Sequence, residues 1–158
     1  MRNKKNKSKK YKKTILNLIL YIILLSILIY SGIKIFKWYK DKTNNNKIAE
    51  QIKSTVIVEE KNEGENKEEY TVNFNKLKEQ NNETIAWLKV NNTNVEYPVV
   101  KGTNNSFYLN HSFDKSNNSA GWIFADYRNK FDNTDKNIII YGHNRREGSM
   151  FGNMKSIL

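Results

Sequence analysis

Residues 14–33 read TILNLILYIILLSILIYSGI, an uninterrupted run without a charged side chain, and this stretch decides the architecture of the chain. An α-helix rises about 1.5 Å per residue, so the run is about 30 Å long and matches the hydrocarbon core of a bilayer. The alternative is a cleaved signal peptide, whose apolar region is shorter and precedes a site of small residues. Ser31–Lys34 matches such a site poorly, and we predict an uncleaved transmembrane signal-anchor helix over residues 14–36.

The excess positive charge of the chain lies around this span. Eleven of the 27 basic residues fall in residues 1–40, which contain no acidic residue, so the rest of the chain has 16 basic and 16 acidic residues. A neutral domain has no basic face for phosphates, and we predict no nucleic-acid binding. Basic residues are denser before the span than after it. This bias predicts a cytoplasmic tail over residues 1–13 in a single-pass protein of the cell membrane, with the C-terminal domain extracellular.

The chain has no cysteine and only two histidines, His111 and His143. A disulfide framework, a thiolate metal site and a cysteine nucleophile within these residues are therefore excluded. Two histidines are too few for a zinc site without carboxylates, and we predict no cofactor and no metal.

Residues 37–69 are polar and end in the charged run EEKNEGENKEE at positions 59–69. This composition predicts a solvated stalk or linker between the membrane and a domain over residues 70–158. Ile48, Ile52 and Val56 have a spacing that would also suit one side of a helical continuation.

The domain contains short apolar runs separated by turn signals. Tyr70, Phe74 and Leu77 have helical spacing, which predicts a short helix that ends near Asn81. Strands are predicted over residues 84–90, 95–100, 121–126 and 137–143. Short strands with few helices predict a mainly β fold, either a barrel or a sandwich.

The last of these runs, Asn137–His143 (NIIIYGH), carries the candidate for chemistry. Alternation along a strand would place Ile139, Tyr141 and His143 on one face. Imidazole has an ordinary pKa of about 6.5, so a histidine at a strand's end suits proton transfer near neutral pH. A structural histidine is the alternative, and the pattern alone does not separate the two.

Six segments of the domain, in order, resemble the class B sortases, the membrane-anchored cysteine transpeptidases of Gram-positive bacteria. The segments are 81–87 (NNETIAW), 95–100 (VEYPVV), 105–111 (NSFYLNH), 121–126 (GWIFAD), 139–144 (IIYGHN) and 148–151 (GSMF). Two positions depart from the family's pattern, because Ala86 stands where glycine is common and Glu83 where aspartate is usual.

The resemblance implies a closed β-barrel with peripheral helices, incomplete in this chain and preceded by the transmembrane helix. It also implies a mechanism in which a cysteine attacks the C-terminal sorting signal of a secreted surface protein and forms a thioacyl intermediate. A histidine protonates the leaving amine, an arginine stabilises the oxyanion, and an amino group of a cell-wall peptidoglycan precursor releases the product. His143 matches the catalytic histidine. The cysteine and the arginine match positions beyond residue 158, so we expect this chain to be inactive alone.

Other conspicuous residues are assigned to the fold. Arg128, Arg145 and Arg146 match no oxyanion motif and are predicted to be exposed loop charges, and His111 is expected to make hydrogen bonds within the fold. Four aromatic residues are predicted to lie in the core: Trp87, Tyr97, Trp122 and Phe124. Two alternatives remain open for the function. One is a pilin-type (class C) sortase, and the other is a membrane-tethered binding module that has a sortase-like fold without catalysis.

Overall fold

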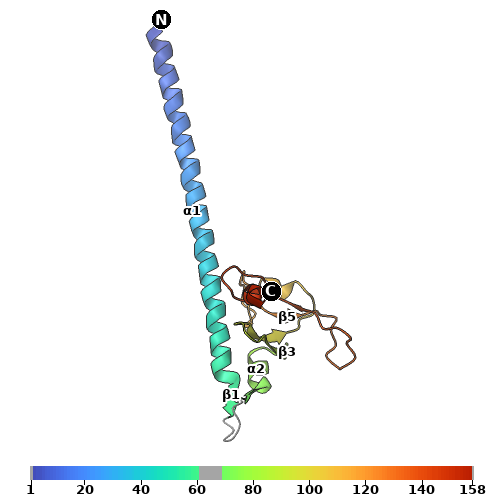
Figure 1. Ribbon diagram of the computed structural model, residues 1–158. Helices are drawn as coiled ribbons and strands as arrows, with labels where there is room; N and C mark the ends of the chain where they lie inside the picture. Colours follow the sequence, from blue (N-terminus) through green and yellow to red (C-terminus); the bar gives the residue numbers. More distant parts are fainter. Residues whose placement is uncertain (1, 61–68, 158) are drawn as a thin grey trace. The chain divides into compact units, whose positions relative to one another are not determined.

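A computed structural model describes residues 2–60 and 69–157 of the chain, with side chains described over residues 11–55 and 71–154. The chain divides into two compact units, Met1–Tyr39 and Lys40–Leu158, and each is described by itself. The elements, in order, are α1 (Arg2–Val56), β1 (Ile57–Glu60), β2 (Glu69–Val72), α2 (Phe74–Gln80), β3 (Thr84–Lys89), β4 (Glu96–Val100), the 3-10 helix η1 (Phe107–Leu109), β5 (Phe124–Ala125), β6 (Ile140–Tyr141) and the 3-10 helix η2 (Gly152–Ile157) (Figure 1).

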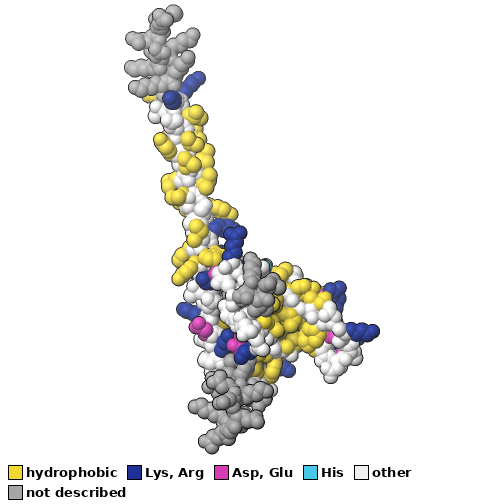
Figure 2. Space-filling model, viewed as in Figure 1, with side chains coloured by type: hydrophobic (Ala, Val, Ile, Leu, Met, Phe, Trp, Pro, Cys, Tyr) yellow, Lys and Arg dark blue, Asp and Glu magenta, His cyan; other side chains and the backbone are white. Residues whose placement is uncertain are grey.

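The first unit is helical, and its large apolar side chains are exposed. They extend from Ile15 to Phe36, and Leu28, for example, is 70% exposed. Figure 2 shows these side chains on the part of α1 that precedes residue 40. A helix that is apolar all round belongs in a protein core or a membrane, and the described apolar side chains of this one are exposed. By length and composition, the apolar part of α1 could cross a membrane.

The second unit includes the last part of α1, residues 40–56, which the sequence analysis placed in a polar stalk. In the structure Asp41, Asn45 and Ile52 are buried, and Ile48 packs against the core. Their spacing of three and four residues puts them on one face of the helix. Two of these four residues, Asp41 and Asn45, are polar. A search for apolar residues alone therefore underestimates how much of this helix face is buried. Residues 61–68 of the predicted stalk lie outside the described residues.

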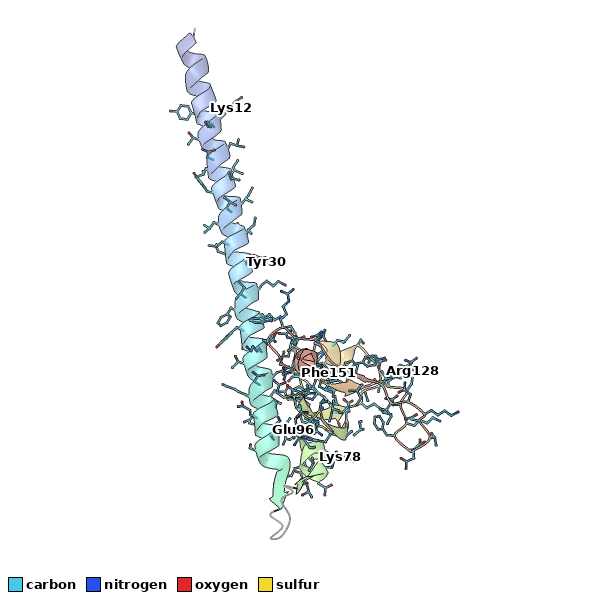
Figure 3. All side chains as sticks on the ribbon, viewed as in Figure 1. Lys12, Tyr30, Lys78, Glu96, Arg128 and Phe151 are labelled. Atoms are coloured by element: carbon cyan, nitrogen blue, oxygen red, sulfur yellow. The ribbon has the colours of Figure 1, made fainter. Side chains whose placement is uncertain are left out.

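The sheet of the second unit has four strands in the order β3-β4-β5-β6. Strands β3 and β4 form an antiparallel hairpin, β5 runs parallel to β4, and β6 pairs antiparallel with β5. Strands β1 and β2 form a separate antiparallel pair. Lys53 of α1 forms an ion pair of 3.2 Å with Glu96, the first residue of β4, which Figure 3 shows beside that helix.

The prediction of a mainly β fold with a closed barrel is only partly met. Among the described residues the sheet is open, with β3 and β6 at its two edges. Four strands are too few to close into a barrel. Helix α1 alone has 55 residues, whereas the strands have two to six residues each.

The core lies around the aromatic residues of β4, β5 and the segments between them. Trp122 is fully buried and donates a hydrogen bond of 3.0 Å from its indole Nε1 to the carbonyl of Pro98. The ring of Tyr97 meets it edge-on at 5.7 Å. The predictions of core positions for Tyr97, Trp122 and Phe124 are confirmed, and Trp87 is partly buried against the same core.

Local predictions differ in accuracy along the domain. Helix α2 begins at Phe74 because the side chain of Asn73 caps it and accepts a hydrogen bond from the backbone N–H of Lys76. Leu77 is buried as expected, whereas Tyr70 belongs to strand β2. The runs at 84–90 and 95–100 are strands, but those at 121–126 and 137–143 are reduced to two paired residues each.

Candidate active site around His143

His143 follows strand β6 closely, and its ring is fixed by a backbone carbonyl. Its Nε2 lies 2.7 Å from the carbonyl oxygen of Leu109, the last residue of η1. A carbonyl oxygen can only accept a hydrogen bond, so Nε2 carries the hydrogen and the neutral ring keeps its lone pair on Nδ1. Among the described residues no hydrogen-bond partner is found for Nδ1. This nitrogen is therefore the one that can exchange a proton with a ligand.

Gly121 makes room for this arrangement. Its φ of +60° lies in the left-handed region. A Cβ atom at this position would lie 2.6 Å from the carbonyl oxygen of Tyr108, 2.8 Å from that of Leu109 and 3.0 Å from Cδ2 of His143. Only glycine allows the backbone to approach η1 and the imidazole ring this closely.

His111 has a different environment from His143. Its ring stacks on that of Phe107 at 3.9 Å with an angle of 7° between the planes. Its Nδ1 lies 2.7 Å from the carbonyl oxygen of the same residue. His111 therefore stabilises the η1 segment from within, as expected from the sequence.

The carboxylate of Asp126 connects the end of β5 to β6. Asp126 is 1% exposed and accepts hydrogen bonds of 2.8 Å from both Nε and Nη2 of Arg128. It also accepts bonds of 2.9 Å from the amide of Asn105 and the hydroxyl of Tyr141. The Arg128 guanidinium, above all, holds the pKa of this carboxyl well below its ordinary value. The bond to Asp126 in turn raises the pKa of Tyr141.

The three arginines near the site do not behave alike. Arg128 is largely exposed, with its side chain 64% accessible, and projects away from the sheet in Figure 3. Arg146 is exposed, as predicted. The prediction for Arg145 is wrong, because its side chain is only 13% exposed and lies 2.7 Å from the carboxylate of Glu147. It also donates a bond of 3.3 Å to the carbonyl of Ser119. These contacts give it a structural role beneath the loop after His143.

The pKa of Glu147 reflects this partly buried pair. Burial on its own would raise the pKa of the carboxyl, but hydrogen bonds led by the one from Arg145 lower it below its ordinary value. Glu147 therefore stays ionised, and the Arg145–Glu147 pair stays intact at neutral pH.

The chemistry available in the described residues is proton transfer by His143. The sequence contains no cysteine, and the parts of the chain with described side chains hold no cluster of His, Asp and Glu suited to a metal ion. Sequence reasoning proposed His143 as the candidate but missed the residues that hold its ring, Leu109 and Gly121 among them. The glycine directly before Trp122 is a signal in the sequence that could have indicated this close approach of the backbone.

No family model matches the chain, but individual relatives do. Sortase B of Listeria monocytogenes is 32% identical over 154 residues, which cover 92% of this chain and 59% of that protein. Sortase B of Staphylococcus aureus is 29% identical over 144 residues, covering 89% of this chain and 56% of that protein. The chain thus spans less than two thirds of the length of these relatives.

Solved structures show the same likeness. Sortase B from Bacillus anthracis superposes with a TM-score of 0.63 at 30% identity, over 75% of this chain and 56% of that one. Sortase B from Clostridium perfringens gives a TM-score of 0.52 at 42% identity, over 54% and 46% of the two chains. A class B sortase of Streptococcus pyogenes involved in pilus biogenesis gives 0.50 at 38% identity, over 53% and 46%. Similarity in sequence and in fold together show that the chain belongs to the class B sortase family.

Proposed function

We propose that the chain is the histidine-bearing part of a membrane-anchored sortase of class B type. The whole enzyme would cleave the C-terminal sorting signal of secreted surface proteins and join them to an amino group of a cell-wall peptidoglycan precursor. One observation carries the proposal. His143 lies in the family-like segment 139–144, and its ring is fixed through Nε2 on the carbonyl of Leu109, so that Nδ1 is left for proton transfer.

In the proposed reaction Nδ1 of His143 first takes the proton of a cysteine thiol from the rest of the enzyme, and the resulting thiolate attacks the carbonyl carbon of the sorting signal. The C–N bond breaks as His143 gives its Nδ1 proton to the leaving amide nitrogen, and a thioester remains. A wall-precursor amine then attacks that thioester, and His143 takes back the proton that the amine loses. An arginine, also from the rest of the enzyme, would stabilise the negative charge on the carbonyl oxygen in both steps.

The N-terminal helix suits this task. We propose that residues 14–36 cross the cell membrane with residues 1–13 in the cytoplasm, which would hold the domain on the outer side. Secreted proteins and lipid-linked wall precursors with free amines both pass that surface. The exposed apolar side chains between Ile15 and Phe36 support the anchor.

Pilin subunits are a second candidate class of client protein. The observation that favours them is the similarity to the Streptococcus pyogenes class B sortase, which is involved in pilus biogenesis. Both classes of client would use the same chemistry at His143. A panel of sorting-signal peptides with different sequences would separate them.

The test begins with the coding DNA downstream of residue 158, which should encode a cysteine and an arginine on later strands. The complete reading frame is then expressed, and cleavage of a fluorogenic sorting-signal peptide is measured together with capture of the thioacyl intermediate. His143→Ala should lower kcat/KM by about 10²- to 10⁴-fold, the usual contribution of a general acid.

His111→Ala is the matched control, because His111 is the other histidine of the chain and packs within the η1 segment. It should keep activity within a few-fold of the wild type. Full activity of His143→Ala would rule out the proposed role. A downstream sequence without cysteine would favour the alternative of a binding module with a sortase-like fold.

A further inference from the structure

A buried polar cluster joins the last part of α1 to the segment that supports His143. Asn45 of α1 is 1% exposed, and its amide Nδ2 donates a hydrogen bond of 2.8 Å to the carbonyl of Gly121. Its Oδ1 accepts bonds from the hydroxyl of Ser112 at 2.5 Å and from the amide of Asn118 at 2.8 Å. One amide side chain thus acts as donor and acceptor at once, which few residue types can do.

Asp41, one helical turn before Asn45, holds the same segment from a second position. Its carboxylate accepts hydrogen bonds from the backbone N–H of Ser119 at 3.0 Å and from the hydroxyl of that residue at 2.6 Å. Its backbone carbonyl accepts another from Asn118 at 3.0 Å. Residues 118–121 are therefore fixed to α1 by hydrogen bonds at three of their four positions.

The fixed segment ends beside the imidazole ring of His143. Gly121 leaves space for Cδ2 of that ring and for the carbonyl of Leu109, which accepts the hydrogen bond from Nε2. The backbone N–H of the next residue, Trp122, bonds to the carbonyl of Tyr108 at 2.9 Å. The position of Gly121 therefore sets the space between η1 and the ring.

We propose that Asn45 is a positioning residue for His143, because its bond to the Gly121 carbonyl keeps the imidazole in place against Leu109. The proposal rests on the catalytic role of His143 proposed above. Asn45 touches no reacting atom and acts through Gly121. Removing the Asn45 amide leaves the buried carbonyl of Gly121 without a hydrogen-bond donor, which is costly. Residues 118–121 should therefore shift toward water when Asn45 is replaced.

A merely structural role for Asn45 makes a different prediction. It would lower stability and leave the ring of His143 unchanged in every molecule that remains folded. The tautomer of His143 therefore separates the two roles. The hydrogen bond to Leu109 holds the proton on Nε2, and a displaced ring would exchange between its two neutral tautomers.

The experiment uses the full chain with ¹⁵N-labelled histidine, held in detergent micelles. The ¹⁵N shifts of the ring nitrogens report the tautomer, and with only two histidines His111 is an internal reference. In the wild type we expect His143 to be protonated on Nε2 at a pH where the ring is neutral. Asn45→Leu keeps the approximate volume but makes no hydrogen bond. It should abolish the single-tautomer signature of His143 and leave that of His111 unchanged.

Ile52→Ala is the matched control. It truncates a fully buried side chain seven residues after Asn45 on the same helix, about 10 Å further along the helix axis. Ile52→Ala should lower stability by at least as much as Asn45→Leu does, without changing the His143 signal. A second variant, Asn45→Ala, introduces a good helix former and leaves room for water to form hydrogen bonds with the groups that Asn45 contacts in the wild type. It covers the case in which Asn45→Leu fails to fold.

The outcomes separate the two proposals. An unchanged His143 tautomer in folded Asn45→Leu or Asn45→Ala overturns the positioning role, as does loss of the His111 and His143 signals together in both variants. The tautomer is measured without turnover, so this result does not depend on whether the enzyme is active. Failure of the proposed function would instead appear as full activity of His143→Ala in the complete protein.

Discussion

At the scale of single residues, Asp126 is a buried carboxylate that connects three segments of the domain. It accepts hydrogen bonds from Arg128, Asn105 and Tyr141, and so ties the end of β5 to the loop before η1 and to β6. The sequence analysis listed it only as the end of a family-like segment. Its partners are two to twenty-one residues away, and no periodic pattern reveals such contacts.

The lowered pKa of Asp126 gives a testable pH dependence. Its carboxylate form is favoured by folding, so its contribution to stability is complete above the unfolded pKa of about 3.9 and is lost as the pH falls toward the lower folded pKa. Asp126→Asn should therefore unfold at lower urea concentration than the wild type at pH 7. The difference between the two urea midpoints should shrink below about pH 4.

Asp132→Asn is the control for this measurement, because Asp132 is an exposed carboxylate that bonds to its neighbour Thr134 in the same loop. It should change the pH 7 midpoint much less than Asp126→Asn. Equal effects of the two variants, or a difference for Asp126→Asn that persists unchanged at pH 3, would contradict the assignment.

Gly121 supports a second prediction at this scale. Gly121→Ala combines a left-handed backbone, which costs a non-glycine residue about 1–2 kcal/mol, with contacts to two backbone carbonyls that cannot move aside easily. Gly148 provides a matched control. Its φ is +86°, but the nearest atom to an added Cβ is 4.0 Å away. Urea unfolding should show a larger loss of stability for Gly121→Ala than for Gly148→Ala, and equal losses would show that the close contacts relax.

At the scale of elements, the accuracy of the sequence analysis follows from the kind of contact that forms each element. Strands β3 and β4 were predictable because a turn signal separates two apolar runs that pair with each other over most of their length. The run at 137–143 has the strongest strand pattern, yet only Ile140 and Tyr141 pair. Ile138 and Ile139 are 48% and 40% exposed. A strand needs a partner, and β5 offers it only two residues.

The last part of α1 was predicted least well. Its buried face consists of Asp41 and Asn45 as well as Ile48 and Ile52, and polar residues in a lysine-rich stretch indicate solvent exposure to any pattern-based method. Burial of these two side chains depends on hydrogen-bond partners more than 65 residues later in the chain. That information lies in the tertiary fold and not in the local sequence.

Ile52 tests whether this helical part belongs to the folded domain. The structure buries it almost completely, at 1% exposure, so Ile52→Ala should lower the free energy of unfolding by about 2–5 kcal/mol. Ser54→Ala, an exposed position two residues later, should stay within about 0.5 kcal/mol of the wild type. Chemical denaturation followed by tryptophan fluorescence measures both. A negligible effect of Ile52→Ala would show that this segment is a solvated stalk, as predicted from the sequence, and not part of the folded domain.

At the scale of the whole molecule, the proposed function requires the two ends of the apolar helix to face different compartments. The basic tail and the neutral domain give the charge asymmetry expected of an anchor with its N-terminus inside. Charge asymmetry predicts orientation, and the exposed apolar side chains of α1 support the span itself. A direct measurement of sidedness is therefore the sharpest test of how the molecule is arranged in the cell.

Residues 1–158 contain no cysteine, so one introduced cysteine is the only thiol when these residues are expressed by themselves, without the cysteine that the proposed function expects in the rest of the enzyme. Lys136→Cys lies at an exposed position of the domain, and Ser8→Cys lies in the predicted cytoplasmic tail. A maleimide that cannot cross membranes should label Lys136→Cys on intact cells and Ser8→Cys only after permeabilisation, while the wild type takes no label. The reverse pattern would place the domain inside the cell. If the first residues were instead removed as a signal peptide, the cysteine of Ser8→Cys would be lost with them, and no chain of the domain would be labelled before or after permeabilisation. An uncleaved anchor keeps the cysteine of Ser8→Cys on the same chain as the domain.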